Sequence, residues 1–144
     1  MERAKMLTRA DEIAAEAHAG QVDKGGAPYI DHPRRVAAAV EDAPAKIVAL
    51  LHDVVEDCSA WTLDRLRAEG FGEDIIEAVD AMTKRRGEDY FSAILRARAN
   101  TIARQVKLAD LADNSDRTRL THVSEADERR LDKYARATLM LRNA

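Results

Sequence analysis

The chain has 144 residues and a formal net charge of −3, and 46% of its residues are hydrophobic although only 4% are aromatic. The slightly negative charge excludes a general attraction to nucleic acid, so we expect no nucleic-acid partner. The single cysteine, Cys58, excludes an internal disulfide bond. The length fits one domain, residues 1–144, and the abundance of Ala, Leu, Glu and Arg favours an all-α fold.

Neither a signal peptide nor a membrane span is visible in the sequence. Residues 1–9 carry several charges, and the longest strongly apolar run, residues 47–51, is far too short to cross a bilayer. We therefore expect a cytoplasmic protein without a membrane partner.

Apolar residues at helical spacing, bounded by glycine, proline and capping residues, predict a bundle of about seven to eight helices. Asp31 and Thr62 are expected to cap two of them, and Ser124 with Asp127 has the form of a capping box. The expected helical ranges are 2–19, 31–40, 43–57, 62–69, 73–83, 88–98, 100–114 and 124–142.

A glycine-rich loop, residues 20–31, precedes the second expected helix and carries Lys24 beside two glycines. Alone, this loop is equally well explained as a surface turn with a solvated lysine. Pro33 suits the first turn of a helix, so it holds His32 at a rigid helix start. A lone histidine there is usually structural, so a role for His32 depends on partners elsewhere in the chain.

The centre of the sequence is the stretch 48–57, in which an apolar run leads into His52, Asp53, Glu56 and Asp57. Positions three or four apart share a helix face, so these side chains project from neighbouring points at one helix end. Crowded carboxylates repel one another and are costly to desolvate unless a cation lies among them. We therefore expect a cation site at this helix end.

Another acidic position lies in the expected helix 100–114, where Asp110 and Asn114 are four residues apart and share a face. Asp110 is on or near the buried side of this helix and therefore needs a partner. The partner is either a metal ion or the side chain of Arg104 or Lys107, and both explanations stay open at this point.

Three separate helices thus offer two imidazoles and two carboxylates as metal ligands: His32, His52, Asp53 and Asp110. This donor set suits manganese, iron, cobalt or zinc, whereas magnesium and calcium prefer all-oxygen sites. A divalent metal lowers the pKa of a bound water and so makes it a nucleophile near neutral pH. Glu56 and Asp57, one turn further on, are placed to orient or deprotonate that water or to protonate a leaving oxygen.

An anionic substrate would need positive or amide contacts near this centre. Lys84 belongs to a basic turn, residues 84–87, which is ordinarily solvated but can hold an anion if it faces a pocket. The candidate substrate contacts are Lys24, Lys84 and Asn114.

The order of these residues resembles the H…HD…D pattern of HD-domain metal-dependent phosphohydrolases. The resemblance is closer still to the hydrolase domain of RelA/SpoT proteins and their stand-alone small alarmone hydrolases, including the metazoan SpoT homologues. The matching segments run in the right order between about residues 10 and 118. They are 17–21 (AHAGQ), 24–25 (KG), 28–33 (PYIDHP), 49–57 (ALLHDVVED), 83–84 (TK) and 107–110 (KLAD), followed by Asn114.

This resemblance implies an all-α HD-domain fold with one bound Mn²⁺ and removal of the 3′-pyrophosphate from ppGpp or pppGpp, which leaves GDP or GTP. The residues that match the metal ligands are His32, His52, Asp53 and Asp110. Those that match the water-handling pair and the substrate contacts are Glu56, Asp57, Lys24 and Asn114. Long family members continue into synthetase and regulatory domains, so we expect this chain only to hydrolyse.

The sequence departs from the family pattern on the side that recognises the guanine base. Asp23 stands where the family usually has an arginine, Leu111 stands where arginine is common, and Arg117 lies one place later than the usual arginine. The metal-binding pattern is complete, whereas the base-recognition pattern is altered. Two alternatives therefore stay open: an NADPH 2′-phosphatase or other nucleotide phosphohydrolase, and a non-catalytic nucleotide-binding module.

Overall fold

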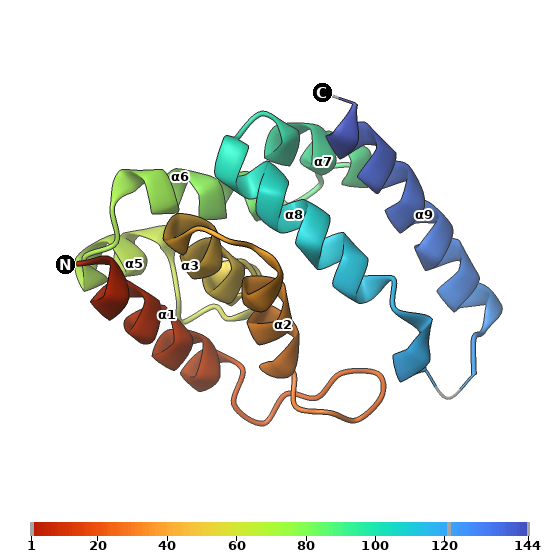
Figure 1. Cartoon of the computed structure of the whole chain (residues 1–144), viewed down its shortest axis with the longest axis horizontal. Coiled ribbons are helices and arrows are strands. Elements are labelled where there is room, and N and C mark those ends of the chain that lie inside the picture. The colour runs from red at the N-terminus through yellow and green to blue at the C-terminus, as the bar shows by residue number, and fades with distance from the viewer. Residues whose placement is uncertain (1, 121, 144) are drawn as a thin grey trace.

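The computed structural model describes residues 2–120 and 122–143. Their regular secondary structure is helical, as the composition predicted (Figure 1). In order, the helices are α1 (Arg3–Ala17), α2 (Asp31–Ala39), α3 (Ala43–Leu51), α4 (Val54–Asp57), α5 (Leu63–Glu69), α6 (Glu73–Met82), α7 (Tyr90–Arg98), α8 (Thr101–Asn114), the 3-10 helix η1 (Arg117–Arg119) and α9 (Glu125–Arg142). No helix in this described part of the chain has the length and apolar character that a membrane crossing requires.

Two expected helix starts are confirmed by their capping bonds. The Thr62 side chain accepts a hydrogen bond from the Arg65 amide at the start of α5. At the start of α9, Ser124 and Asp127 satisfy each other's backbone amides in the expected capping box. Short-range sequence signals therefore set these two helix starts.

Two other starts differ from expectation. Asp31 does not cap α2 but lies inside its first turn, where its negative charge complements the helix dipole. The helix expected from residue 88 begins at Tyr90, because the Asp89 side chain accepts hydrogen bonds from the amides of Phe91 and Ser92.

The prediction of one continuous helix over residues 43–57 is wrong. Helix α3 ends at Leu51, His52 and Asp53 form a turn, and the single-turn helix α4 follows. The His52 Nδ1–H donates to the carbonyl oxygen of Ala49, which is the usual helical partner of the Asp53 amide. The side chain thus competes with the backbone, and the turn separates His52 and Asp53 from Glu56 and Asp57.

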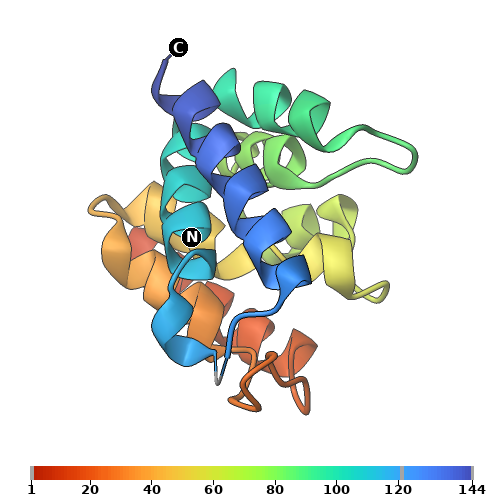
Figure 2. The same ribbon diagram turned by 90° about the vertical axis from the view of Figure 1, so that its right-hand side faces the viewer.

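Helix α8 occupies the middle of the fold, between α2 and α3 on one side and α7 and α9 on the other (Figures 1 and 2). The main core cluster joins α1, α2, α3, α6 and α8, and a smaller one joins α7, α8 and α9. Fully buried members of the main cluster include Ile13, Val36, Ile47, Leu51, Ile76 and Val106. The smaller cluster consists of Ile94, Leu111, Ala137 and Leu141. Packing on both faces fixes α8 against the start of α2 and the end of α3.

Candidate active site

Four of the predicted site residues lie together where α2, the α3–α4 turn and α8 meet. His32 Nε2 is 2.9 Å from Asp110 Oδ1, and His52 Nε2 is 3.3 Å from the same oxygen. The second carboxylate, Asp53 Oδ2, lies 3.0 Å from His52 Nε2 and 3.8 Å from His32 Nε2. The structure therefore brings residues separated by up to 78 positions into one cluster.

This cluster has the chemistry and the dimensions of a metal centre. His32, His52 and Asp53 form a group whose ligand atoms all lie within 4.8 Å of one another, and Asp110 contacts both histidines. Two ligands about 2.1 Å from one ion and at right angles lie about 3 Å apart, which is close to the separations found here. Imidazoles and carboxylates together suit a divalent transition metal. The residues present therefore fit such an ion.

The electrostatics of the cluster favour positive charge at its centre. Burial disfavours the charged form of His32, but the neighbouring Asp110 outweighs burial and the net pKa of His32 is raised. Against burial, Asp53 and Asp110 likewise raise the pKa of His52 well above its ordinary value. Against the same burial, His52 lowers the pKa of Asp53 to about 2. A metal ion bound at this point would supply the same positive charge.

Asp110 also has the ion-pair partner that the sequence left open. Lys107 Nζ lies 2.9 Å from Asp110 Oδ2, while Oδ1 faces the two histidines. Asn114 Nδ2 donates to Oδ1 at 3.2 Å. Despite burial, Lys107 holds the pKa of Asp110 well below its ordinary value. The ion pair and the metal-ligand geometry therefore use different oxygens of one carboxylate.

Two further hydrogen bonds hold side chains of the cluster, and their partners, Tyr29 and Asp113, were not among the predicted site residues. Tyr29 Oη donates to Asp53 Oδ2 at 2.7 Å. His32 Nδ1 lies 2.6 Å from Asp113 Oδ2. Tyr29 stood within the matching segment 28–33, but only the fold shows which residue its hydroxyl contacts. Asp113 sits three residues after Asp110, a spacing that many solvated helical carboxylates share.

Glu56 and Asp57 lie on α4, one turn after the clustered residues, and both side chains reach solvent. Burial raises the pKa of Glu56, and the negative charge of Asp53 raises it further. The backbone amide of Lys84, 3.5 Å from Glu56 Oε2, partly offsets this rise. Burial and Asp53 also raise the pKa of Asp57. Both carboxylates are thus within electrostatic reach of the cluster without forming part of it.

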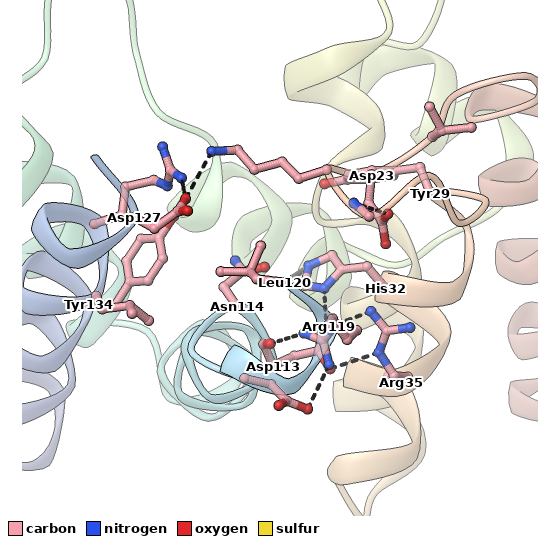
Figure 3. Close-up of a pocket in the computed structure, with 16 residues that line it drawn as sticks. Asp23, Tyr29, His32, Arg35, Asp113, Asn114, Arg119, Leu120, Asp127 and Tyr134 are labelled. Carbon is pink, nitrogen blue, oxygen red and sulfur yellow. Dashed lines mark hydrogen bonds and ion pairs between the residues drawn. The ribbon is translucent and has the colours of Figure 1, made fainter. Parts of the chain in front are cut away.

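A pocket of about 360 Å³ opens beside His32 and contains two of the three predicted substrate contacts, Lys24 and Asn114 (Figure 3). Lys24 Nζ lies 3.6 Å from Asp127 Oδ1 on α9. The structure does not place Lys84 in this pocket: it is exposed on the loop after α6, and its backbone amide faces Glu56.

Sequence reasoning missed most of the charged residues that line the pocket. The pocket has as many basic residues as carboxylates, and each basic residue forms an ion pair with at least one of Asp113, Asp116 and Asp127. The four basic residues are Lys24, Arg35, Arg119 and Arg130, and the four acidic ones are Asp23, Asp113, Asp116 and Asp127. No local spacing signal could have found Arg35 and Arg119, because they meet only through Asp113 (Figure 3).

The positions that depart from the family pattern have distinct places in the fold. Asp23 lines the pocket, and its Oδ1 accepts hydrogen bonds from the amides of Gly25 and Ala27, which fold the loop back on itself. Leu111 is buried in the smaller core cluster. Arg117 pairs with Glu128 outside the pocket.

The sequence pattern of the HD domain family matches residues 10–139, so the chain belongs to the HD domain family. Within it, the chain is 43% identical over 76 residues to a guanosine-3′,5′-bis(diphosphate) 3′-pyrophosphohydrolase of Haemophilus influenzae, covering 50% of this chain and 11% of that relative. It is 32% identical over 149 aligned positions to the bifunctional (p)ppGpp synthase/hydrolase SpoT of Escherichia coli, covering 94% of this chain and 20% of that relative. The chain therefore spans only a fifth or less of these two relatives.

A solved structure supports the same fold. It is described as a metazoan ortholog of SpoT that hydrolyzes ppGpp and plays a role in starvation responses, and it aligns with a TM-score of 0.76. The alignment covers 94% of this chain and 84% of that chain at 24% sequence identity. The all-α arrangement is thus the HD-domain fold.

Proposed function

We propose that the chain is a metal-dependent hydrolase that removes the 3′-pyrophosphate of ppGpp or pppGpp. The observation that carries this proposal is the convergence of two histidines and two aspartates beside a pocket of about 360 Å³. The names of the relatives support the same substrate.

One Mn²⁺ would be held by the four clustered residues, His32, His52, Asp53 and Asp110. When bound, such an ion supplies Lewis acidity and lowers the pKa of a coordinated water. The Lys107 ammonium group pairs with Oδ2 of Asp110, so Oδ1 of this carboxylate would be the oxygen that binds the metal.

Glu56 and Asp57 would act as the general acid and base that transfer protons in the reaction. Water adds to the phosphorus next to the ribose 3′-oxygen, the bond between that phosphorus and the 3′-oxygen breaks, and the 3′-oxygen takes up a proton. The products are pyrophosphate and GDP or GTP. Raised pKa values favour proton uptake by these two carboxylates relative to an ordinary carboxylate. Lys24 and Asn114 would contact the nucleotide in the pocket.

A second candidate keeps the chemistry and changes the substrate, to NADPH cleaved at its 2′-phosphate or to another phosphorylated nucleotide. The observation that favours it is the pocket: Asp23 stands where an arginine is usual, and the basic residues that line the pocket are paired with carboxylates. Such a pocket attracts a polyphosphate less strongly than one with free cations.

A substrate panel tests both candidates. Metal-stripped protein is incubated with ppGpp, pppGpp, NADPH or deoxynucleoside triphosphates, with Mn²⁺ or with a chelator, and the products are separated by ion-exchange chromatography. Pyrophosphate release from ppGpp that requires Mn²⁺ and is lost in Asp53→Asn supports the first candidate. Cleavage of another nucleotide without turnover of ppGpp contradicts it and favours the second. No turnover of any substrate contradicts both.

A further inference from the structure

Asp113 joins the candidate metal centre to the wall of the pocket. Its Oδ2 lies 2.6 Å from His32 Nδ1, and its Oδ1 accepts a hydrogen bond from Arg35 Nε at 2.8 Å. The Arg35 Nη2 donates to Oδ2 at 3.1 Å, and the guanidinium of Arg119 lies 3.4 Å from the same oxygen. Figure 3 shows both arginines converging on this carboxylate.

This contact decides which ring nitrogen of His32 can bind a metal. A neutral imidazole carries its proton on one ring nitrogen and its lone pair on the other. A metal ion at the centre of the cluster needs the lone pair on Nε2, and Asp113 then accepts the proton on Nδ1. Nε2 is the atom that faces Asp110 and Asp53. Asp113 therefore selects the tautomer that directs the lone pair toward the centre of the cluster.

The other histidine of the cluster is held in a different way. His52 Nδ1–H donates to the backbone carbonyl of Ala49, only three residues earlier, so its Nδ1 partner is local. His32 stands at the start of α2, and its Nδ1 partner comes from α8, 81 residues away. The orientation of the His32 ring thus depends on a tertiary contact.

Arg35 and Arg119 in turn hold Asp113 in place. Both arginines form ion pairs with the carboxylate oxygens of Asp113. Their positive charges offset the negative charge of this half-buried side chain. The oxygen that accepts the His32 proton is therefore fixed in position.

We propose that Asp113 is a positioning residue of the metal centre, one that fixes the tautomer and orientation of His32 and strengthens metal binding through it. This inference rests on the proposed metal centre. Partners of this kind, behind a metal-bound histidine, typically contribute about 10- to 100-fold to metal affinity.

The test is calorimetric titration of metal-stripped protein with MnCl₂, without any substrate. We expect Asp113→Ala to bind Mn²⁺ about 10- to 100-fold more weakly than the unchanged protein. Asp113→Asn is the conservative variant: its carbonyl oxygen can still accept from His32 Nδ1, but the second oxygen that holds Arg35 and the negative charge are lost, so a smaller loss is expected. The matched control is Asp116→Ala, which removes a carboxylate that pairs with Arg119 but has no contact with His32, and it should retain the original affinity.

A spectroscopic measurement separates positioning from general destabilisation. In ¹⁵N-histidine-labelled protein loaded with Zn²⁺, His32 should show a protonated Nδ1 and a metal-bound Nε2, and Asp113→Ala should lose that pattern while His52 keeps its own. Thermal unfolding shows whether each variant is folded. If Asp113→Ala does not fold, Asp113→Asn alone tests the role of Asp113.

The outcomes are distinguishable. Folded Asp113 variants that bind Mn²⁺ within about twofold of the unchanged protein, far below the usual effect of such partners, would overturn the inference and leave the proposed function intact. An unchanged protein that binds no Mn²⁺ would overturn the proposed metal centre itself. Equal losses in Asp113→Ala and Asp116→Ala would also contradict a role through His32.

Discussion

Binding of a divalent metal should stabilise the whole fold and not only the site. The four clustered residues come from α2, the α3–α4 turn and α8, and these elements also enclose the main core. Unfolding separates them and destroys the site, so the metal binds the native state alone.

The size of the effect follows from mass action. A ligand that binds only the folded state adds about 2.7 kcal/mol of stability when its free concentration is about a hundred times Kd. For a domain of this size each kcal/mol raises Tm by roughly 2–4 °C, so Mn²⁺ should raise Tm by roughly 5–10 °C.

The matched variant is Asp53→Asn, which removes a charged ligand but keeps a carbonyl oxygen that can accept from the Tyr29 hydroxyl. If its affinity for the metal falls about a hundredfold, the same concentration adds only about 0.4 kcal/mol, or roughly 1 °C.

The assay is thermal unfolding followed by circular dichroism, on chelator-treated protein with and without Mn²⁺. Absence of a Tm shift in the unchanged protein at saturating Mn²⁺ would refute the convergence of the four residues on one ion. A shift in Asp53→Asn as large as in the unchanged protein would refute the participation of Asp53.

Glu56→Gln should lower kcat about a hundredfold or more while calorimetry finds Mn²⁺ affinity unchanged; undiminished turnover would remove its proton-transfer role. The Arg96 guanidinium lowers the pKa of Glu88 from an ordinary 4.5 to about 2, so the stability that this pair provides is complete above about pH 4.5 and is lost as the pH falls toward 2. Urea unfolding of the unchanged protein and of Glu88→Gln, at about pH 6 and about pH 3, should show a difference in stability that shrinks at the lower pH; an equal difference at both contradicts the assignment. Leu111→Ala, at a position only 1% exposed, should cost about 2–5 kcal/mol in the same assay, whereas Leu139→Ala, 58% exposed, should cost under about 0.5 kcal/mol; similar losses would contradict the burial of Leu111.

The amino-acid sequence determined most of the helices, because helix periodicity and caps act between residues three or four positions apart. The capping bonds of Thr62 and of Ser124 with Asp127 are of this kind, and they formed where the sequence predicted. The order of His32, the His52–Asp53 pair and Asp110 also marked the HD domain family, to which the chain belongs. Their roles as metal ligands remain a prediction.

Tertiary structure decided everything that depends on the packing of distant helices. Nothing local distinguishes Asp113 from a solvated carboxylate; its contact with His32, 81 residues away, follows from the burial of apolar faces between α2 and α8. The turn at His52 forms because the His52 side chain and the Asp53 amide compete for the carbonyl oxygen of Ala49. The periodicity of apolar residues does not reveal this competition. Arg119, far from Arg35 in sequence, reaches the same carboxylate only because η1 turns the chain back after α8. The contacts of Asp113 with His32 and Arg35 thus join groups whose separation is set by the core, whereas the turn at His52 follows from a local competition.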